Sequence, residues 1–507
     1  MPKINKTMIV DKNTLKTIML STIPNSLAVT GRIMDWLKNE ESRLPASCTV
    51  FKVKDSMEGT DGIEDSWLFT SYGLRNAAGV AVDLSSIRPN GSDNGRGLVA
   101  SGAVSFAKFY SLINQELRRG GVYKNGAITL FLDYDHPDCI DFINMPTSEL
   151  PWAKRAVYVD NGLINHPIKK ELARRVNDGT VWLAKKSYDA EGNRLYSNVC
   201  LEVLIPSRGT CMLSSVNLGS FSDLDSIEEG FKKSMEWLCR LHGLTGVGSK
   251  GHYLSPEEDK QVGLGVIGLA NLLAIHGVSY SEFTYALTES LDREQDPQGD
   301  YLDNTLDLDS PCPDTAFEVA NAIIQGYKAA SKVAREYGMK RAFAVAPTAS
   351  MSYRYKDADG FTTAPEISAP IDFEVDRDSD TFGVETFEYH PNTERAKDVG
   401  WDTQWALLNA WQRLQDSTGL GHAISANIWS SQVVDESFID KFLASDLVTT
   451  YYRISVDQVA LDKSEVITPD SDEEKLKALY DVKEEEPVIC TLRRPEDDEQ
   501  FCEACSG

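Results

Sequence analysis

Residues 197–202 read Ser-Asn-Val-Cys-Leu-Glu, and the interpretation of the whole chain starts from this stretch. Asn198, Cys200 and Glu202 stand at alternate positions, and in an extended strand or finger such side chains point to the same side. An amide, a thiol and a carboxylate would then converge. Because a thiol next to an acid in an apolar run more often serves packing than catalysis, the spacing needs support from elsewhere in the chain.

The other cysteines supply that support. Cys211 follows Cys200 by eleven residues, and Cys48 opens an apolar run expected to be a strand; either alone fits a buried core thiol. Cys502 and Cys505 form a C-x-x-C on an acidic terminal segment that has no core to fill, which indicates redox or metal chemistry. A structural zinc needs four ligands and this segment offers two, so no metal site is expected and a mobile dithiol that exchanges with a buried disulfide is favoured.

Composition and charge exclude several classes of function. The 507 residues are 42% hydrophobic and 25% charged, as in an ordinary globular protein with a sizeable core. A formal charge of -26 argues against a nucleic-acid partner, since such surfaces are basic. The odd count of nine cysteines, the lack of a signal-peptide pattern and the short, glycine-rich apolar stretch at 262–278 predict a cytoplasmic protein without a membrane span.

The order of apolar patterns predicts an α/β architecture. Residues 1–44 are expected to form a short helical cap that is broken at Pro24, and residues 465–507 a mobile acidic tail. Between them, short β-branched or apolar runs alternate with longer helical patterns. The expected strands are 49–53, 127–132, 199–205, 342–346 and 449–454, and the expected helices are 104–119, 227–241, 262–276, 314–337 and 403–418.

One glycine motif points to another class of function. Gly263, Gly265 and Gly268 match a dinucleotide fingerprint, and Glu282 stands near the position of its ribose-binding acid. The motif lies in a run expected to be helical, without a preceding strand, so we interpret the glycines as helix packing. An NAD-binding dehydrogenase is a remote alternative.

Taken together, these residues resemble the large, catalytic subunit of ribonucleotide reductase. The motifs that carry the resemblance occur in order from about residue 45 to the end: Ser47-Cys48, Ser197 to Glu202, Cys211 with Asn217-Leu218-Gly219, Pro347 to Ser352, Ile424 to Asn427, Tyr451-Tyr452 and the terminal C-x-x-C. The resemblance implies that residues 45–464 form a ten-stranded α/β barrel of two five-stranded parallel halves. A finger loop with Cys200 at its tip is then expected to run through the centre of that barrel.

The resemblance also implies a role for each central residue. Cys200 would become a transient thiyl radical that takes the 3'-hydrogen of a ribonucleotide, Glu202 would take the 3'-hydroxyl proton, and Asn198 would orient the substrate. Cys48 and Cys211 would supply reducing equivalents as the 2'-hydroxyl leaves as water.

The remaining cysteines divide into a shuttle and a structural group. Cys502 and Cys505 would re-reduce the Cys48–Cys211 disulfide and be recharged by thioredoxin or glutaredoxin. The resemblance therefore implies a ribonucleoside-diphosphate reductase, an oxidoreductase of deoxyribonucleotide biosynthesis. Structural roles are expected for Cys139, Cys239, Cys312 and Cys490.

Two nucleotide sites follow from the same resemblance. The substrate site would be formed by Ser47, Pro347, Thr348, Ala349, Ser350, Met351 and Ser352, whose hydroxyls and amides suit a diphosphate; the family often has an acidic residue where Ala349 stands. The effector site, for a deoxynucleoside triphosphate or ATP with Mg, would be formed by Asp55, Ser56, Met57, Arg88, Arg96, Gly121, Lys124 and Asn125. An effector at a dimer interface implies a homodimer when nucleotide is bound.

The source of the radical is the open question at this point. Tyr451 and Tyr452 are typical of class I enzymes, which receive the radical from a separate ferritin-like metal subunit, and we favour this form. An adenosylcobalamin-dependent (class II) enzyme is the alternative, and a nucleotide-binding regulator without chemistry is remote. Only about 44 residues precede the first expected strand, so the chain is expected to lack the N-terminal ATP cone of many relatives and its dATP inhibition.

Overall fold

The computed structural model describes residues 12–38, 44–93, 95, 97–117, 126–296, 312–379 and 383–456. A seven-stranded sheet forms one half of the molecule. Its five inner strands are mutually parallel: β2 (Cys48–Lys52), β3 (Gly79–Asp83), β4 (Ile128–Asp133), β5 (Lys154–Val159) and β6 (Trp182–Lys185). Its edges are the short antiparallel strands β10 (Thr210–Cys211) and β18 (Thr449–Thr450). The inner strands are buried along almost their whole length, as expected for a parallel sheet covered on both faces.

A five-stranded sheet forms the other half. Its parallel strands are β11 (Leu213–Asn217), β12 (Gln261–Ile267), β13 (Arg341–Val345) and β16 (Gly421–Ile424). The fifth strand, β1 (Leu27–Val29), pairs antiparallel with β11. It lies between α1 (Lys12–Ser21) and α2 (Gly31–Lys38), so the expected helical cap also contributes a fully buried strand to the sheet.

The two sheets meet along two seams. At one seam only Met212 separates β10 from β11, and its carbonyl accepts a hydrogen bond from Gly263 N at 3.0 Å. At the other, Thr449 in β18 donates its hydroxyl to the Ile424 carbonyl of β16 at 2.6 Å. The α/β barrel prediction is confirmed, and the strand count differs in detail. The first sheet adds two antiparallel edge strands to its five parallel ones, and the second has four parallel strands and one antiparallel strand instead of five parallel ones.

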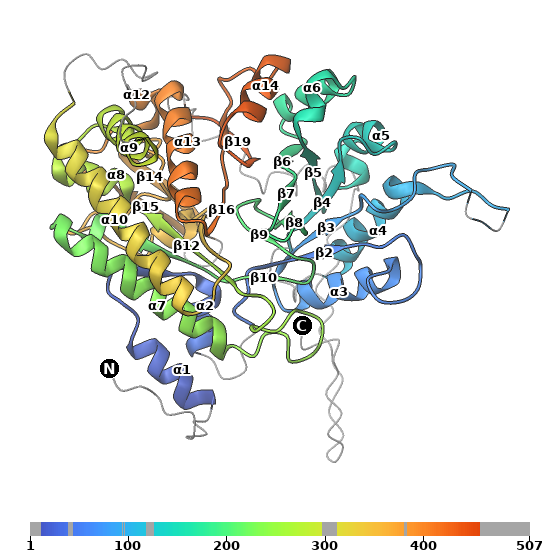
Figure 1. The fold of residues 1–507 in the computed structure, drawn as a ribbon, viewed down its shortest axis with the longest axis horizontal. Helices are drawn as coiled ribbons and strands as arrows, with labels where there is room; N and C mark the ends of the chain where they lie inside the picture. Colours follow the sequence, from blue (N-terminus) through green and yellow to red (C-terminus); the bar gives the residue numbers. More distant parts are fainter. Residues whose placement is uncertain are drawn as a thin grey trace.

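Helices cover the outer faces of both sheets, as Figure 1 shows. The helices over the first sheet are α3 (Ile63–Arg75), α4 (Gly102–Glu116), α5 (Cys139–Asn144) and α6 (Lys169–Asn177). The helices over the second sheet are α7 (Ile227–Leu244), α9 (Tyr280–Gln295), α10 (Asp314–Glu336) and α13 (Trp401–Ser417). The helices predicted at 104–119, 227–241, 314–337 and 403–418 are therefore confirmed within a few residues. Among the described helices, none has the length and apolar character needed to cross a membrane.

The remaining strands and α-helices are short. They are the finger strands β7 (Ser187–Tyr188), β8 (Arg194–Ser197) and β9 (Leu204–Ile205), the hairpin of β14 (Glu374–Ser379) and β15 (Gly383–Glu388), the pair β17 (Ile428–Trp429) and β19 (Arg453–Ile454), and the helices α8 (Leu269–His276), α11 (Ala349–Ser352), α12 (Ala396–Val399) and α14 (Glu436–Ala444).

The helix predicted at 262–276 is wrong in its first half, where the chain forms β12 before α8 begins at Leu269. All seven residues of β12 are buried between β11 and β13, and an apolar run buried on every side looks alike in a strand and a helix. The glycines serve close strand packing: a side chain at Gly263 would strike Leu213, and one at Gly265 would strike the Ala344 carbonyl. The interpretation of these glycines as helix packing is therefore wrong.

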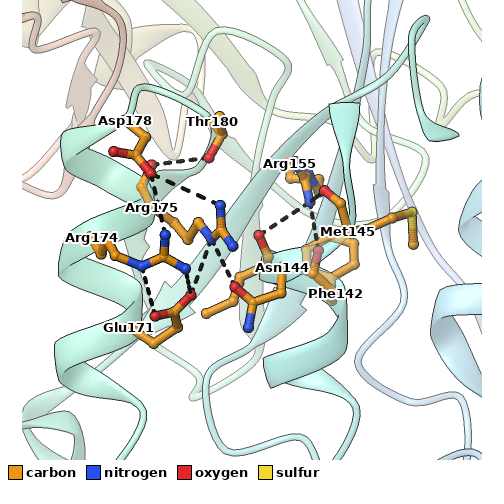
Figure 2. Close-up of polar contacts among 10 residues, drawn as sticks. Phe142, Asn144, Met145, Arg155, Glu171, Arg174, Arg175, Asp178 and Thr180 are labelled. Carbon is orange, nitrogen blue, oxygen red and sulfur yellow. Dashed lines mark hydrogen bonds and ion pairs between the residues drawn. The ribbon is translucent and has the colours of Figure 1, made fainter. Parts of the chain in front are cut away.

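A buried arginine fixes the outer helices of the first sheet (Figure 2). Arg155 of β5 donates to the carbonyls of Phe142 and Met145 at 2.8 and 2.6 Å, at the end of α5 where helical carbonyls lack partners. Burial lowers its pKa to about 10, so the side chain remains a cation at neutral pH. Arg175 of α6 then donates to Asn144 at 2.8 Å, which joins the two helices.

Candidate active site

A tight turn forms the tip of the finger loop, between the antiparallel strands β8 and β9. Asn198 N donates to the Val203 carbonyl at 3.0 Å, and Leu201 N donates to the Asn198 carbonyl at 3.2 Å. Leu201 has a φ of 67°, a left-handed conformation that costs a non-glycine residue about 1 kcal/mol or more. The extended strand predicted at 199–205 is therefore wrong here, and the turn itself brings Asn198 and Glu202 together.

An amide, a carboxyl group and a hydroxyl group meet at this turn. Asn198 Nδ2 donates to Glu202 Oε1 at 2.9 Å, and Asn198 Oδ1 accepts from Val203 N at 3.1 Å. Ser425, which follows β16, donates to the Cys200 carbonyl at 2.5 Å and lies 3.3 Å from Glu202 Oε2. The finger tip is thus tied to the second sheet through Ser425, a residue to which the sequence analysis gave no role.

Glu202 has the electrostatics of a general base. Its side chain is buried, and burial raises its pKa to about 7 while the hydrogen bonds from Asn198 and Ser425 act in the opposite direction. A carboxyl group that is half ionised near neutral pH can accept a proton and release it again with little driving force in either direction.

Three thiols lie in contact beside this carboxyl group. Cys48 and Cys211 face each other directly in the antiparallel pairing of β2 and β10, and the Cys48 thiol shares hydrogen bonds with both Cys200 and Cys211. All three side chains belong to one apolar cluster inside the barrel, and none forms a disulfide. The residues predicted at widely separated positions are therefore brought together.

The surroundings keep the Cys48 and Cys200 thiols protonated. The hydrogen bond to Cys48, burial and the nearby Glu202 charge raise the pKa of Cys200 well above its ordinary value. For Cys48, the hydrogen bond with Cys200 lowers the pKa, but Cys211 and burial outweigh it and the net pKa is well raised. Thiolates are the reactive form in nucleophilic chemistry, so this environment suits hydrogen-atom chemistry of S–H groups better.

Tyr451 and Tyr452 connect the thiols to the surface. The Tyr451 hydroxyl is hydrogen-bonded to the Cys200 thiol and to the Tyr452 hydroxyl, and the two rings lie 4.3 Å apart between centroids. Trp182 packs against both rings at 4.6 and 4.9 Å. Tyr451 is 8% exposed and Tyr452 is 41% exposed, so the pair spans the distance from solvent to the buried cluster.

The segment predicted to bind substrate, residues 347–352, follows the end of β13. Pro347, Ala349 and Ser350 are exposed, whereas Thr348, Met351 and Ser352 are buried, and residues 349–352 form the short helix α11. Ser47, the other predicted substrate residue, donates its backbone N–H to the Cys211 carbonyl at 3.0 Å.

Two charged residues that the sequence analysis missed contact this segment. Thr348 N donates to Glu366 Oε1 at 2.9 Å, and Arg377 of β14 donates to Ser350 Oγ at 2.9 Å. The Glu202 charge also acts on Glu366. Glu366 lies in a loop and Arg377 in the β14–β15 hairpin, and no sequence pattern indicates that either side chain contacts residues 347–352.

The predicted effector residues Asp55, Ser56, Met57 and Arg88 line one cavity of about 480 Å³. Asp55 Oδ2 accepts from Arg88 Nε at 2.7 Å, and Phe106 of α4 contributes an apolar wall. The other predicted effector residues, Arg96, Gly121, Lys124 and Asn125, lie outside the described residues, as do Cys490, Cys502 and Cys505. Of the cysteines expected to be structural, Cys139 and Cys239 are buried and Cys312 is half-buried.

Known proteins share this fold and parts of this sequence. Residues 46–196 and 184–291 match the family described as "Ribonucleotide reductase, barrel domain". The vitamin B12-dependent ribonucleoside-diphosphate reductases of Mycobacterium tuberculosis (strain CDC 1551 / Oshkosh) and Thermoplasma acidophilum are 27% and 24% identical over 290 and 286 residues, each covering 47% of this chain. The chain spans only 40% and 36% of the length of these two relatives.

A solved structure gives the longer match. The class Id ribonucleotide reductase alpha subunit of Actinobacillus ureae superposes with a TM-score of 0.58 at 14% identity, covering 85% of this chain and 87% of that one. At this level of identity the match establishes the fold alone.

Proposed function

Residues 46–291 belong to the ribonucleotide reductase barrel-domain family, and from this premise we propose that the chain is the catalytic subunit of a ribonucleotide reductase that acts on ribonucleoside diphosphates. The observation that carries the proposal is the contact of the Cys48, Cys200 and Cys211 thiols beside the Glu202 carboxyl group. The names of the sequence relatives support the diphosphate substrate.

The proposed reaction gives each group one task. A Cys200 thiyl radical takes the 3'-hydrogen atom of the ribose, and Glu202 takes the 3'-hydroxyl proton while Asn198 holds the substrate. Protonation then lets the 2'-hydroxyl leave as water.

The electrons for this step come from the other two thiols. Cys48 and Cys211 together give up two electrons and two protons and become a disulfide, and Cys200 returns its hydrogen atom to C3'. The products of the reaction are a deoxynucleotide and water. We assign the re-reduction of the Cys48–Cys211 disulfide to Cys502 and Cys505, with thioredoxin or glutaredoxin as their reductant.

For the source of the radical we favour a separate ferritin-like metal subunit. The hydrogen-bonded line from exposed Tyr452 through Tyr451 to Cys200 offers a route by which an electron and a proton can leave the half-buried thiol toward the partner, which converts the thiol into a thiyl radical. A partner that docks over Tyr452 would need no direct access to Cys200.

Adenosylcobalamin is the second candidate source, because the sequence relatives carry "Vitamin B12-dependent" in their names. When bound, this cofactor supplies a radical directly to a cysteine. In the described residues the Tyr451 side chain lies against Cys200, so the cofactor could approach from this side only if Tyr451 moved. The fit is poorer than that of the tyrosine route.

We also propose that the cavity around Asp55 and Arg88 binds a deoxynucleoside triphosphate or ATP with Mg, and that the chain forms a homodimer when this site is filled. Leu68 of α3 and Phe109 and Leu112 of α4 are exposed apolar side chains, and α4 also contributes Phe106 to the cavity wall. Exposed apolar residues on neighbouring helices are typical of a protein interface.

The direct test is turnover of the Cys200→Ser variant. With CDP or ADP, a dithiol and each radical source in turn, the unaltered chain should form deoxynucleotide and Cys200→Ser should form none. The matched control is Cys312→Ser, which alters a half-buried thiol outside the cluster and should remain active. Deoxynucleotide formation by Cys200→Ser would refute the proposal.

A further inference from the structure

Glu366 is a half-buried acid that the proposed reaction leaves without a task. It lies in the loop after α11 and is joined to Thr348 by two reciprocal hydrogen bonds: Thr348 N donates to Glu366 Oε1 at 2.9 Å, and Glu366 N donates to Thr348 Oγ1 at 3.0 Å. Its φ of 57° is left-handed, a conformation that a glutamate keeps only where its surroundings fix it. The carboxyl group is thus held in one place, against one amide.

That amide belongs to the segment assigned to substrate phosphate. A backbone N–H that donates to a carboxylate offers the same hydrogen bond to a phosphate oxygen, and both acceptors are anions. A phosphate at Thr348 therefore competes with the Glu366 carboxylate for the donor and is repelled by its charge. Ser350, two residues after Thr348, accepts a hydrogen bond from Arg377, which brings a cation to the same segment.

We propose that Glu366 is a positioning residue whose carboxylate holds the Thr348 amide in the ligand-free protein and takes up one proton from solvent when a phosphate binds there. The inference rests on the proposed function, since it requires that residues 347–352 bind the phosphates of the substrate. The only covalent bond formed is the O–H bond of the Glu366 carboxyl group, so the step is a protonation coupled to phosphate binding.

The charges around Glu366 favour this exchange. Burial raises its pKa to about 7, the Thr348 amide acts in the lowering direction, and the charge of Glu202 on the finger loop raises it further. Glu202 and Arg377 are the charged groups that the described residues bring to Glu366 and to its segment. A proton is therefore gained with little driving force near neutral pH, and a doubly ionised Glu202–Glu366 pair is avoided.

The test is calorimetric titration of the full chain with inorganic pyrophosphate at about pH 6 and about pH 8, in two buffers of different ionisation enthalpy so that bound protons are counted. The test variant is Glu366→Gln, which keeps an acceptor for the Thr348 amide but cannot ionise. Glu374→Gln, an exposed carboxyl at the start of β14, is the matched control. Arg377→Ala should weaken binding and so locate the anion on this segment.

At about pH 8 the unaltered chain and Glu374→Gln should take up roughly one proton more per pyrophosphate than Glu366→Gln, which should bind about tenfold more tightly than they do. At about pH 6 the three affinities should converge, because Glu366 is then protonated beforehand. Glu366→Ala should resemble Glu366→Gln, since the bond from residue 366 N to Thr348 Oγ1 uses the backbone.

Equal proton uptake and equal affinity in the unaltered chain and Glu366→Gln, with binding still weakened by Arg377→Ala, would overturn this inference and leave the substrate assignment intact. Absence of pyrophosphate binding at both pH values in every protein would overturn the substrate assignment and the inference together.

Discussion

Replacing Glu202 by Gln should separate two effects of this acid: the folding stability lost by burying its charge, and its contribution to turnover. Glu202 is 1% exposed and its pKa is about 7, whereas the same group in the unfolded chain has the ordinary value of 4.5. A difference of about two and a half pKa units corresponds to about 3 kcal/mol. Because the folded pKa is the higher one, the folded protein binds this proton more tightly, and its stability falls as pH rises from about 4.5 to about 7.

Gln at this position can still accept from Asn198 and cannot ionise. Below about pH 5 the two proteins should therefore unfold with similar free energies, and by about pH 8 the variant should be the more stable by up to about 3 kcal/mol. Urea unfolding at both pH values measures this, and other buried acids such as Asp259 cancel because both proteins contain them.

The same variant should lose roughly a hundredfold to ten-thousandfold in turnover, because it lacks the base that takes the 3'-hydroxyl proton. The turnover of the unaltered enzyme should rise with pH through about 7 as Glu202 ionises. A stability difference that does not change with pH, or full turnover by Glu202→Gln, would refute the reasoning.

Two further substitutions test the radical route and the effector site. Tyr451→Phe removes only the hydroxyl that bonds to Cys200, so unfolding free energy should fall by about 1 kcal/mol while turnover with a metal subunit stops; unchanged turnover would exclude the tyrosine route. Arg88→Ala removes the partner of Asp55 from the effector cavity and should weaken deoxynucleoside triphosphate binding at least about tenfold in equilibrium dialysis, whereas unaltered affinity would place the effector elsewhere.

The sequence was informative where a local pattern carries the information, and the long amphipathic helices such as α7 and α10 are examples. It was misleading where burial removes the pattern, as in β12, and where a turn depends on tertiary support, as at Leu201 with its left-handed backbone. The meeting of three thiols came from a family resemblance, since strand pairing between residues 48 and 211 cannot be worked out from either segment alone.

Glu366 shows a different limit. Its contact with Thr348 joins residues eighteen positions apart in irregular chain, and neither residue type nor spacing distinguishes such a pair from two surface residues. Only the folded chain shows that this acid is held against the predicted phosphate segment.

The two candidate radical sources make opposite demands on the seam at residues 449–454. This seam fixes both tyrosines by backbone hydrogen bonds, from Tyr451 N to the Ala426 carbonyl at 2.7 Å and from Ile428 N to the Tyr452 carbonyl at 2.9 Å. A relay through the side chains needs the seam closed, because the hydroxyl of Tyr451 must stay on the Cys200 thiol. A cobalamin that reaches the thiol from this side needs the seam open, and opening it breaks those bonds and unpacks both rings from Trp182. The closed seam therefore meets the requirement of the proposed tyrosine route, whereas the names of the sequence relatives point to the cofactor route, which would require the seam to open.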